Sequence, residues 1–337
     1  MMHRSPSDRA RPRRYLVTGG AGFIGSHLSE ALVEQGCDVI ALDDLSTGSE
    51  TNLTSLEHSD RFRLVVGSIL DGRLLDELAA QCDGVVHLAA AVGVRRIIEQ
   101  PLRSLVTNIR GTEQVIEAAH RHGRHLFIAS SSEVYGKNTH APLHEDSDCL
   151  LGTPSRSRWG YSVSKAADEH LALAYSREQG LSVVIGRFFN TVGPRQSPAY
   201  GMVIPRMIQQ ALTGEPVTVY GDGSQTRCFC HVSDVVRAVL ALLDAAGTAG
   251  EAYNVGSTEE VSINDLAYRV LAATGSRSPV VHIPYEQAFS SGFEDMMRRV
   301  PDTGKVQSLI GWRPRQDLDA ILRAMVEHAN AVNAATS

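Results

Sequence analysis

Short runs of apolar and β-branched residues alternate with longer stretches of helical periodicity along the first half of the chain. The apolar runs cover residues 15–18, 39–42, 63–66, 84–88 and 125–129. Helical patterns begin at Gly22 and after Pro101. Short strands that alternate with helices are typical of βαβ units. The pattern predicts an α/β fold in which helices cover both faces of a doubly wound parallel sheet.

The alternation continues through a helix at about 158–179 and a strand at 181–186, and it breaks at Pro194, where the loops become longer. We therefore expect a first domain over 14–190 and a smaller C-terminal α/β substrate lobe over 191–337, some segments of which return to the first domain. Residues 1–13 are basic and lack the apolar run of a secretory signal, so they predict a disordered tail.

Composition narrows the class of partner. A chain of 337 residues with 43% hydrophobic residues can bury a large core. Its net charge of -6 offers no basic surface for nucleic acid, and no apolar stretch reaches the ~20 residues of a membrane span. The five scattered cysteines favour a reducing, cytoplasmic setting, and only Cys228 and Cys230 lie close together, which is too few ligands for zinc. We expect a small-molecule partner and no metal.

A glycine-rich loop follows the first strand. Gly19, Gly22 and Gly25 are spaced so that the backbone can turn tightly, approach a pyrophosphate and point a helix N-terminus at it. About 20 residues further on, the second strand ends at Asp43, whose carboxylate can accept hydrogen bonds from both ribose hydroxyls. A 2'-phosphate would be repelled there, and no arginine follows at once. The pattern indicates NAD as the cofactor.

Tyr161 and Lys165 form a Tyr-x-x-x-Lys pattern within a predicted helix. Residues four apart lie on one helix face. Lys165 is one of only three lysines, the others being Lys137 and Lys305. A cation beside a phenol favours the phenolate, so the pattern predicts a Tyr161 pKa lowered from about 10 toward neutrality. Tyr161 is a candidate base.

Several further segments carry a resemblance to a known family. They are HLAA at 87–90, TNIRGT at 107–112, RFFNTVGPR at 187–195 and GSQTRCF at 223–229. With the glycine loop, Asp43 and the Ser/Tyr/Lys set, they resemble the extended short-chain dehydrogenases/reductases that act on nucleotide sugars, from about Arg14 to the C-terminal helix. Members of that family have a Rossmann-type NAD-binding sheet. One departure is Ser68, where the family commonly has an aspartate near the adenine.

The resemblance implies roles for individual residues. Tyr161 would be the base toward a sugar hydroxyl, Lys165 would hold the nicotinamide ribose, and Ser131 would orient the substrate. Cofactor contacts are implied for Gly19, Gly22, Phe23, Ile24, Gly25, Asp43, Leu88, Ala89, Ala90, Asn108, Tyr161 and Lys165. Substrate contacts are implied for Asn190, Arg195, Tyr220, Arg227 and Arg299.

The end of the fifth apolar run bears on the reaction. In SSSEVYG at 130–136, Ser132 and Glu133 occupy the positions that resemble Asp-Glu in 4,6-dehydratases. Eliminating a C6 hydroxyl needs an acid, which Ser132 is not at neutral pH. Ser-Glu-Val-Tyr-Gly resembles the UDP-glucuronate decarboxylases (UDP-xylose synthases), as do SRWGYSVSK at 157–165 and the segment at 298–312 that contains Arg299.

The decarboxylase interpretation gives these residues tasks. Oxidation of C4 by NAD places a ketone β to the C5 carboxylate, and a β-keto acid loses CO2 readily. Ser132 and Glu133 could hold the carboxylate or a water, and Arg299 could stabilise charge or help to deliver a proton. Hydride then returns to C4, so no net oxidation occurs.

Two alternatives stay open. A nucleotide-sugar 4-epimerase acting on UDP-glucose or UDP-glucuronate would use the same oxidation and return hydride to the other face. HLAAAVGVRRIIEQP at 87–101 is also at home in epimerases, and Met202 stands where decarboxylases commonly carry an arginine. A non-catalytic NAD-binding scaffold is the remote alternative. The helices at 101–122 and 158–180 resemble the family's four-helix dimer interface, which implies a homodimer.

Overall fold

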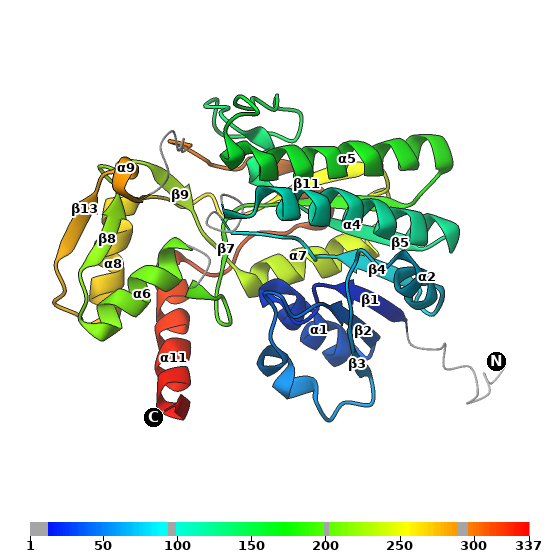
Figure 1. The fold of residues 1–337 in the computed structure, drawn as a ribbon, viewed down its shortest axis with the longest axis horizontal. Coiled ribbons are helices and arrows are strands. Elements are labelled where there is room, and N and C mark those ends of the chain that lie inside the picture. Colours follow the sequence, from blue (N-terminus) through cyan, green and yellow to red (C-terminus); the bar gives the residue numbers. More distant parts are fainter. Residues whose placement is uncertain (1–12, 94–98, 199–201, 289–295, 337) are drawn as a thin grey trace, which may run out of the picture.

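A parallel sheet of seven strands forms the centre of the larger part of the protein (Figure 1). The computed structural model describes residues 13–93, 99–198, 202–288 and 296–336. The strand order is β11-β6-β5-β4-β1-β2-β3. The strands are β1 (Arg14–Thr18), β2 (Asp38–Asp43), β3 (Phe62–Val66), β4 (Gly84–His87), β5 (His125–Ser131), β6 (Val183–Phe188) and β11 (Glu251–Val255). The predicted α/β parallel sheet is confirmed.

Helices cover both faces of this sheet. One face packs on α1 (Phe23–Glu34), α7 (Val232–Asp244) and α10 (Gly304–Ile310). The other packs on α2 (Gly72–Ala80), α4 (Pro101–Arg121) and α5 (Gly160–Gln179). Every residue of β6 is buried, so the strand begins with consecutive apolar residues instead of alternating ones, and its one charged residue, Arg187, is buried as well.

Local signals set the ends of the helices that carry the site. Pro101 opens α4 at the first helical position, where a missing N–H costs nothing. Gly180 ends α5 with a φ of 70°, a left-handed conformation that glycine adopts without strain. The strand β5 runs two residues further than the apolar pattern indicates, through Ser130 and Ser131, and the 3-10 helix η2 (Ser132–Tyr135) follows it directly.

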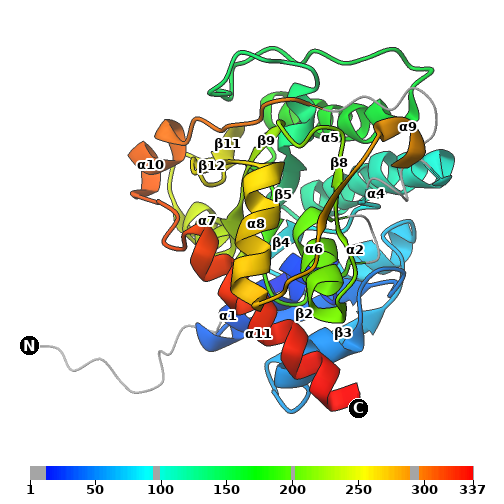
Figure 2. The same cartoon turned by 90° about the vertical axis from the view of Figure 1, so that its left-hand side faces the viewer.

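The second lobe is built around the parallel pair β8 (Val217–Tyr220) and β13 (Val280–Ile283). Helices α6 (Val203–Thr213), α8 (Ile263–Thr274) and α11 (Leu318–Thr336) pack together there around a separate apolar core. In Figure 2 this lobe is turned toward the viewer. The smaller elements are β7 (Thr191–Val192), β9 (Thr226–Cys228), β10 (Cys230–His231), β12 (Glu260–Ser262), α9 (Tyr285–Ala288), η1 (Glu50–Leu56) and η3 (Ser157–Trp159).

The chain crosses between the two parts more than once. After the first elements of the second lobe, α7 and β11 return to the large sheet, and α10 does so again. No helix in the described ranges combines the length and apolar character needed to cross a membrane. The predicted tail at 1–13 lies outside the described residues except for Arg13, and residues 94–98 of the epimerase-like segment also lie outside them.

Candidate active site

A cavity of about 940 Å³ lies at the carboxyl ends of the strands of the large sheet and extends to the second lobe. In open α/β sheets this is the edge at which ligands bind. Nearly all of the predicted site residues line it. They are Gly19, Gly22, Phe23, Ile24, Gly25, Asp43, Leu88, Ala89, Ala90, Ser131, Ser132, Glu133, Tyr161, Lys165, Asn190, Tyr220, Arg227 and Arg299.

Two glycines of the glycine loop have no room for a side chain. Gly19 has a φ of 73°, and a Cβ there would lie 2.8 Å from the backbone nitrogen of Ala89. A Cβ on Gly25 would overlap the Gly19 carbonyl oxygen, and Gly22 is the N-cap of α1. The backbone can therefore come close to an anion at the start of α1, as the pyrophosphate of a dinucleotide requires.

Asp43 lies at the end of β2 and faces the same cavity. Its Oδ2 accepts a hydrogen bond from the Ala21 N–H at 3.0 Å, and its Oδ1 accepts one from the Leu45 N–H at 2.9 Å. Burial raises the pKa of the Asp43 carboxyl, and the backbone donors act in the opposite direction. The carboxylate is held in place beside the glycine loop, where it can accept hydrogen bonds from a ribose.

The pKa of Tyr161 differs from the sequence prediction. The surrounding protein desolvates the phenol and raises its pKa, and the nearby carboxylates of Glu133 and Asp168 raise it further, although a hydrogen bond with Ser131 acts in the opposite direction. Lys165 does not offset these effects because its ammonium pairs with Asp168 at 3.2 Å and donates to the Ala129 carbonyl at 3.0 Å. The predicted lowering by Lys165 is wrong for this arrangement of the side chains.

Ser132, Glu133 and Arg299 come together although Arg299 is 166 positions beyond Glu133. Nη1 of Arg299 donates to Oε1 of Glu133 at 2.8 Å and to Oγ of Ser132 at 3.2 Å. Ser131 is the N-cap of η2, and its Oγ accepts a hydrogen bond from the Glu133 N–H at 3.3 Å. The structure thus places the three predicted residues at one end of the cavity, next to Tyr161.

Arg158 completes this cluster, and the sequence analysis assigned no role to it. Its Nη1 lies 2.6 Å from Oε2 of Glu133, and its Nη2 lies 3.1 Å from Oε1. Burial alone would raise the pKa of Glu133, but the two guanidinium groups outweigh it and lower that pKa to about 2. Glu133 is therefore an anion at neutral pH. Its single negative charge faces two arginines, which leaves a net positive charge on the cluster.

Residues of the second lobe line the far end of the cavity. The guanidinium of Arg206, on α6, stacks on the ring of Tyr220 at 4.1 Å from its centroid. Arg227 is buried and also lines the cavity. Asn190 donates to the Cys228 carbonyl at 2.9 Å and so joins the segment after β6 to β9. Arg206 was not predicted from the sequence, where its signal is an arginine in the first turn of an amphipathic helix.

Two predicted binding residues lie elsewhere. The guanidinium of Arg195 binds Glu30 at 2.7 Å and Ser26 at 3.2 Å, both on α1, so it is directed at the cofactor helix and does not line the cavity. Asn108 is buried between α4 and α5, where it accepts from the Ala91 N–H at 2.7 Å and donates to Ser164 at 3.2 Å. Both residues thus have protein partners and do not line the cavity, and their predicted ligand contacts stay predictions.

Comparison with known proteins agrees with this geometry. The model of the NAD dependent epimerase/dehydratase family matches residues 15–256. A UDP-N-acetyl-alpha-D-glucosaminuronate decarboxylase of Bacillus cytotoxicus is 41% identical over 94% of this chain and 97% of its own. UDP-glucuronic acid decarboxylase 1 of Danio rerio is 34% identical over 96% of this chain and 73% of its own.

A solved structure is similar over nearly the whole chain. The UDP-glucuronic acid 4-epimerase of Bacillus cereus, in complex with UDP-glucuronic acid and NAD, superposes with a TM-score of 0.86 at 30% identity. The match covers 95% of this chain and 99% of that one. The fold, the glycine loop and the family model agree, and the cofactor is NAD. The chain belongs to the NAD dependent epimerase/dehydratase family.

Proposed function

We propose that the protein is an NAD-dependent decarboxylase of a UDP-uronate, with UDP-glucuronate as substrate and UDP-xylose as product. The observation that carries the proposal is the cluster of Arg158, Glu133 and Arg299 beside Tyr161. The cluster has a net positive charge and faces the cavity. The Nε of Arg299 is buried, and no hydrogen-bond partner for it lies among the described residues. A uronate carboxylate would supply the negative charge that this cluster lacks.

The reaction begins at C4 of the sugar. Tyr161, hydrogen-bonded to Ser131, takes the proton from the C4 hydroxyl as the hydride leaves C4. NAD, when bound beside Tyr161, would supply the hydride acceptor, and its positive charge would counter the burial that raises the pKa of Tyr161 and so favour the phenolate. Gly19, Gly22, Gly25 and Asp43 would hold the dinucleotide, because they form the close-approach loop and the ribose acceptor.

The cluster then governs the loss of CO2. The bond between C5 and the carboxylate carbon breaks, CO2 leaves, and the electron pair passes into the C4 ketone to form an enolate. This requires the breaking bond to stand perpendicular to the plane of the ketone. Two arginines that grip a carboxylate can impose that orientation, and Glu133 neutralises part of their charge, so that the departing group is not overstabilised. C5 takes up a proton that comes from the solvent, because the proton on Tyr161 returns to the C4 oxygen as hydride returns to C4.

Glu133 cannot serve as an acid in a dehydration. Its pKa of about 2 leaves it ionised at neutral pH, and its neighbour Ser132 is a neutral hydroxyl. Neither residue is therefore a neutral carboxylic acid that could protonate a C6 hydroxyl as it leaves. This supports decarboxylation over dehydration.

A second substrate has a specific observation in its favour. The Bacillus cytotoxicus relative, at 41% identity, carries the name of a decarboxylase of the 2-acetamido analogue of UDP-glucuronate. The two compounds share the C4 hydroxyl and the C5 carboxylate on which the chemistry depends, and they differ only at C2. The same cluster could act on both.

Product analysis tests the proposal. The purified protein with NAD is incubated separately with UDP-glucuronate, its 2-acetamido analogue and UDP-glucose, and proton NMR and CO2 release are recorded. UDP-xylose with stoichiometric CO2 from UDP-glucuronate is the expected result. A mixture of C4 epimers without CO2 would instead identify a 4-epimerase, as in the Bacillus cereus neighbour, and a selective reaction of the acetamido compound would move the substrate to that analogue.

We also propose that the protein is a homodimer that pairs through α4 and α5. These helices pack side by side on one face of the large sheet (Figure 1). Leu102 on α4 and Val163 on α5 are 75% and 42% exposed. Exposed apolar residues on neighbouring helices are typical of a surface that a second subunit covers.

A further inference from the structure

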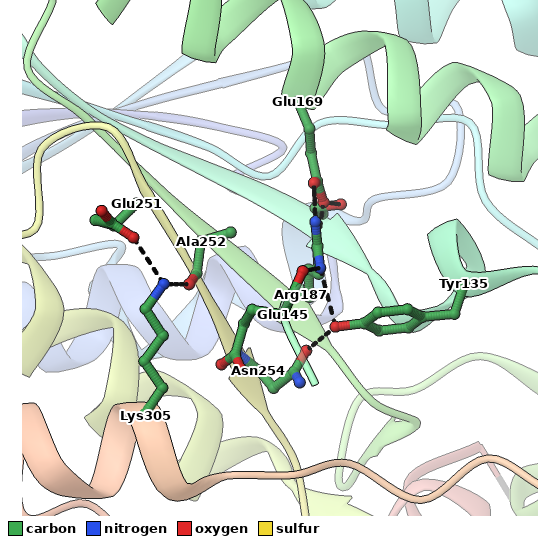
Figure 3. Close-up of polar contacts among 9 residues, drawn as sticks. Tyr135, Glu145, Glu169, Arg187, Glu251, Ala252, Asn254 and Lys305 are labelled. Atoms are coloured by element: carbon green, nitrogen blue, oxygen red, sulfur yellow. Dashed lines mark hydrogen bonds and ion pairs between the residues drawn. The ribbon is translucent and has the colours of Figure 1, made fainter. Parts of the chain in front are cut away.

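A buried hydrogen-bond network joins Glu169, Arg187, Tyr135 and Asn254 (Figure 3). It starts on α5, the helix of Tyr161 and Lys165. The carboxylate of Glu169, two turns beyond Tyr161, forms an ion pair with Arg187 of β6, with Nη2 2.6 Å from Oε2 and Nε 2.9 Å from Oε1. Oγ of Ser130 donates to the same carboxylate at 2.5 Å. The catalytic helix is thereby joined to β5 and β6 at one point.

The network continues into η2. The Nη1 atom of Arg187 donates to the hydroxyl oxygen of Tyr135 at 3.0 Å and to the Glu145 carbonyl at 2.7 Å. Tyr135 is the last residue of the same 3-10 helix that contains Ser132 and Glu133. Its side chain is fully buried and does not line the cavity.

From Tyr135 the network reaches the segment that carries Arg299. The Tyr135 hydroxyl donates to Oδ1 of Asn254, on β11, at 2.7 Å. Nδ2 of Asn254 donates to the carbonyls of Leu143 at 2.8 Å and of Asp302 at 3.1 Å. Burial raises the pKa of Tyr135 to about 12, so the phenol keeps the proton that it donates.

The residues after Arg299 are held at three places. Leu143 donates its N–H to the Val300 carbonyl at 2.8 Å, and its own carbonyl accepts from the Asp302 N–H at 2.9 Å. Further along, Nζ of Lys305 donates to the Ala252 carbonyl at 2.8 Å and pairs with Glu251 at 2.7 Å, both on β11 (Figure 3). Asn254 lies between these contacts and donates to a carbonyl of each paired segment, that of Leu143 and that of Asp302.

We propose that Tyr135 and Asn254 are positioning residues that set Arg299 relative to Tyr161. Arg299 must reach Glu133 from a segment far along the chain, and Tyr161 is held by a different element, α5. The chain Glu169, Arg187, Tyr135, Asn254 connects the two. The inference rests on the proposed decarboxylation, and it predicts that the network matters more for the loss of CO2 than for the oxidation at C4.

The variant Tyr135→Phe removes one oxygen from the middle of the network. Arg187 keeps Glu169 and the Glu145 carbonyl, whereas Oδ1 of Asn254 loses the hydrogen bond that it accepts from Tyr135. A misplacement of about 1 Å can lower a rate by about 100-fold. We expect the first-order rate constant of CO2 release to fall about 10- to 100-fold, and that of NADH formation to stay within about threefold of wild type.

The measurement is rapid-mixing absorbance of NADH together with release of labelled CO2 from UDP-glucuronate, or from its 2-acetamido analogue if that is the better substrate. NADH should build up in Tyr135→Phe during turnover. First-order rate constants do not depend on the fraction of folded enzyme, so a loss of yield does not obscure the result. Asn254→Asp cuts the next link, because it keeps the acceptor for Tyr135 and removes both amide donors, and it should produce the same separation.

Tyr253→Phe is the matched control. Tyr253 neighbours Asn254 on β11 and is also buried, and its ring, which phenylalanine keeps, lies 4.8 Å from Nζ of Lys305. It should leave both rate constants unchanged. If both steps slow equally in Tyr135→Phe, or neither slows, the positioning role is wrong. A wild-type enzyme that forms NADH but releases no CO2 would instead remove the proposed function itself.

Discussion

Arg158 donates to both carboxylate oxygens of Glu133, at 2.6 and 3.1 Å. Two roughly parallel bonds from one guanidinium fix the plane of the carboxylate as well as its place. Arg299 binds the same carboxylate from the other end of the chain. The contact between Arg158 and Glu133 therefore helps to set how much positive charge the cluster presents to a substrate carboxylate.

Arg158→Lys should slow decarboxylation. Lysine keeps the charge and cannot form the two-pronged contact with Glu133. Loss of one hydrogen bond to a charged group corresponds to about 10- to 100-fold in rate. CO2 release from UDP-glucuronate checks this, with the exposed Arg156→Lys as the control. Wild-type turnover in Arg158→Lys would show that the bidentate contact is not needed for the reaction.

Tyr161→Phe should abolish most of the activity. Removal of a general acid–base group typically costs about 100- to 10,000-fold. NADH formation and CO2 release should fall together, because Tyr161 acts in the oxidation at C4 and CO2 is lost only after that oxidation. Tyr175→Phe lies on the same helix, where its ring contacts His120, and should be silent. A Tyr161→Phe enzyme as fast as wild type would support the non-catalytic scaffold alternative.

Glu133→Gln should lower stability in a pH-dependent way. The pKa of Glu133 is lowered from 4.5 to about 2 in the folded protein. A lowered folded-state pKa contributes stability that is present above the unfolded value and is lost as the pH falls toward the folded value. Each tenfold change in the ionisation constant corresponds to about 1.4 kcal/mol, which gives a contribution of roughly 3 kcal/mol at neutral pH.

Urea unfolding of wild type and Glu133→Gln at a series of pH values measures that contribution. The difference between the two proteins should be largest near neutrality and about 1 kcal/mol smaller near pH ~4. A difference that stays constant with pH would mean that the carboxylate charge is not what stabilises the cluster.

Asp43→Ala should weaken NAD binding. The carboxylate is held by two backbone N–H groups and faces the cavity, where it can accept hydrogen bonds from the adenosine ribose. Its loss should raise the Kd for NAD about 10- to 100-fold, as measured by calorimetry, because hydrogen bonds to a charged group are removed. The exposed Asp60→Ala is the control. Equal affinities in the two variants would place the ribose elsewhere.

Val163→Glu combined with Leu102→Glu should convert a dimer into a monomer. Burying two carboxylates in an apolar contact carries a large desolvation penalty. Light scattering coupled to size-exclusion chromatography measures the mass. Val332→Glu, at another exposed apolar position on α11, should not change it. A wild-type protein that is monomeric at micromolar concentration would contradict the proposed dimer directly.

The local patterns of the sequence were sufficient for the large sheet, the glycine loop, the Asp43 strand end and the helix of Tyr161 and Lys165. Each depends on residues close together in the chain: the period of apolar positions, glycines spaced three apart after a strand, and a spacing of four on a helix. The sequence also indicated that the polar residues of SSSEVYG belong to the site, and the structure places Ser131, Ser132 and Glu133 in the lining of the cavity.

The sequence by itself thus determined the parallel α/β sheet, the cofactor loop and the residue types of the site. The tertiary structure decided which side chains of the site contact one another. Only folding shows that Arg158 binds Glu133, that Lys165 pairs with Asp168, and that Arg195 turns to α1. These contacts, and the raised pKa of Tyr161, depend on burial and on partners brought together by long-range packing. Spacing along the chain carries no information about such distances.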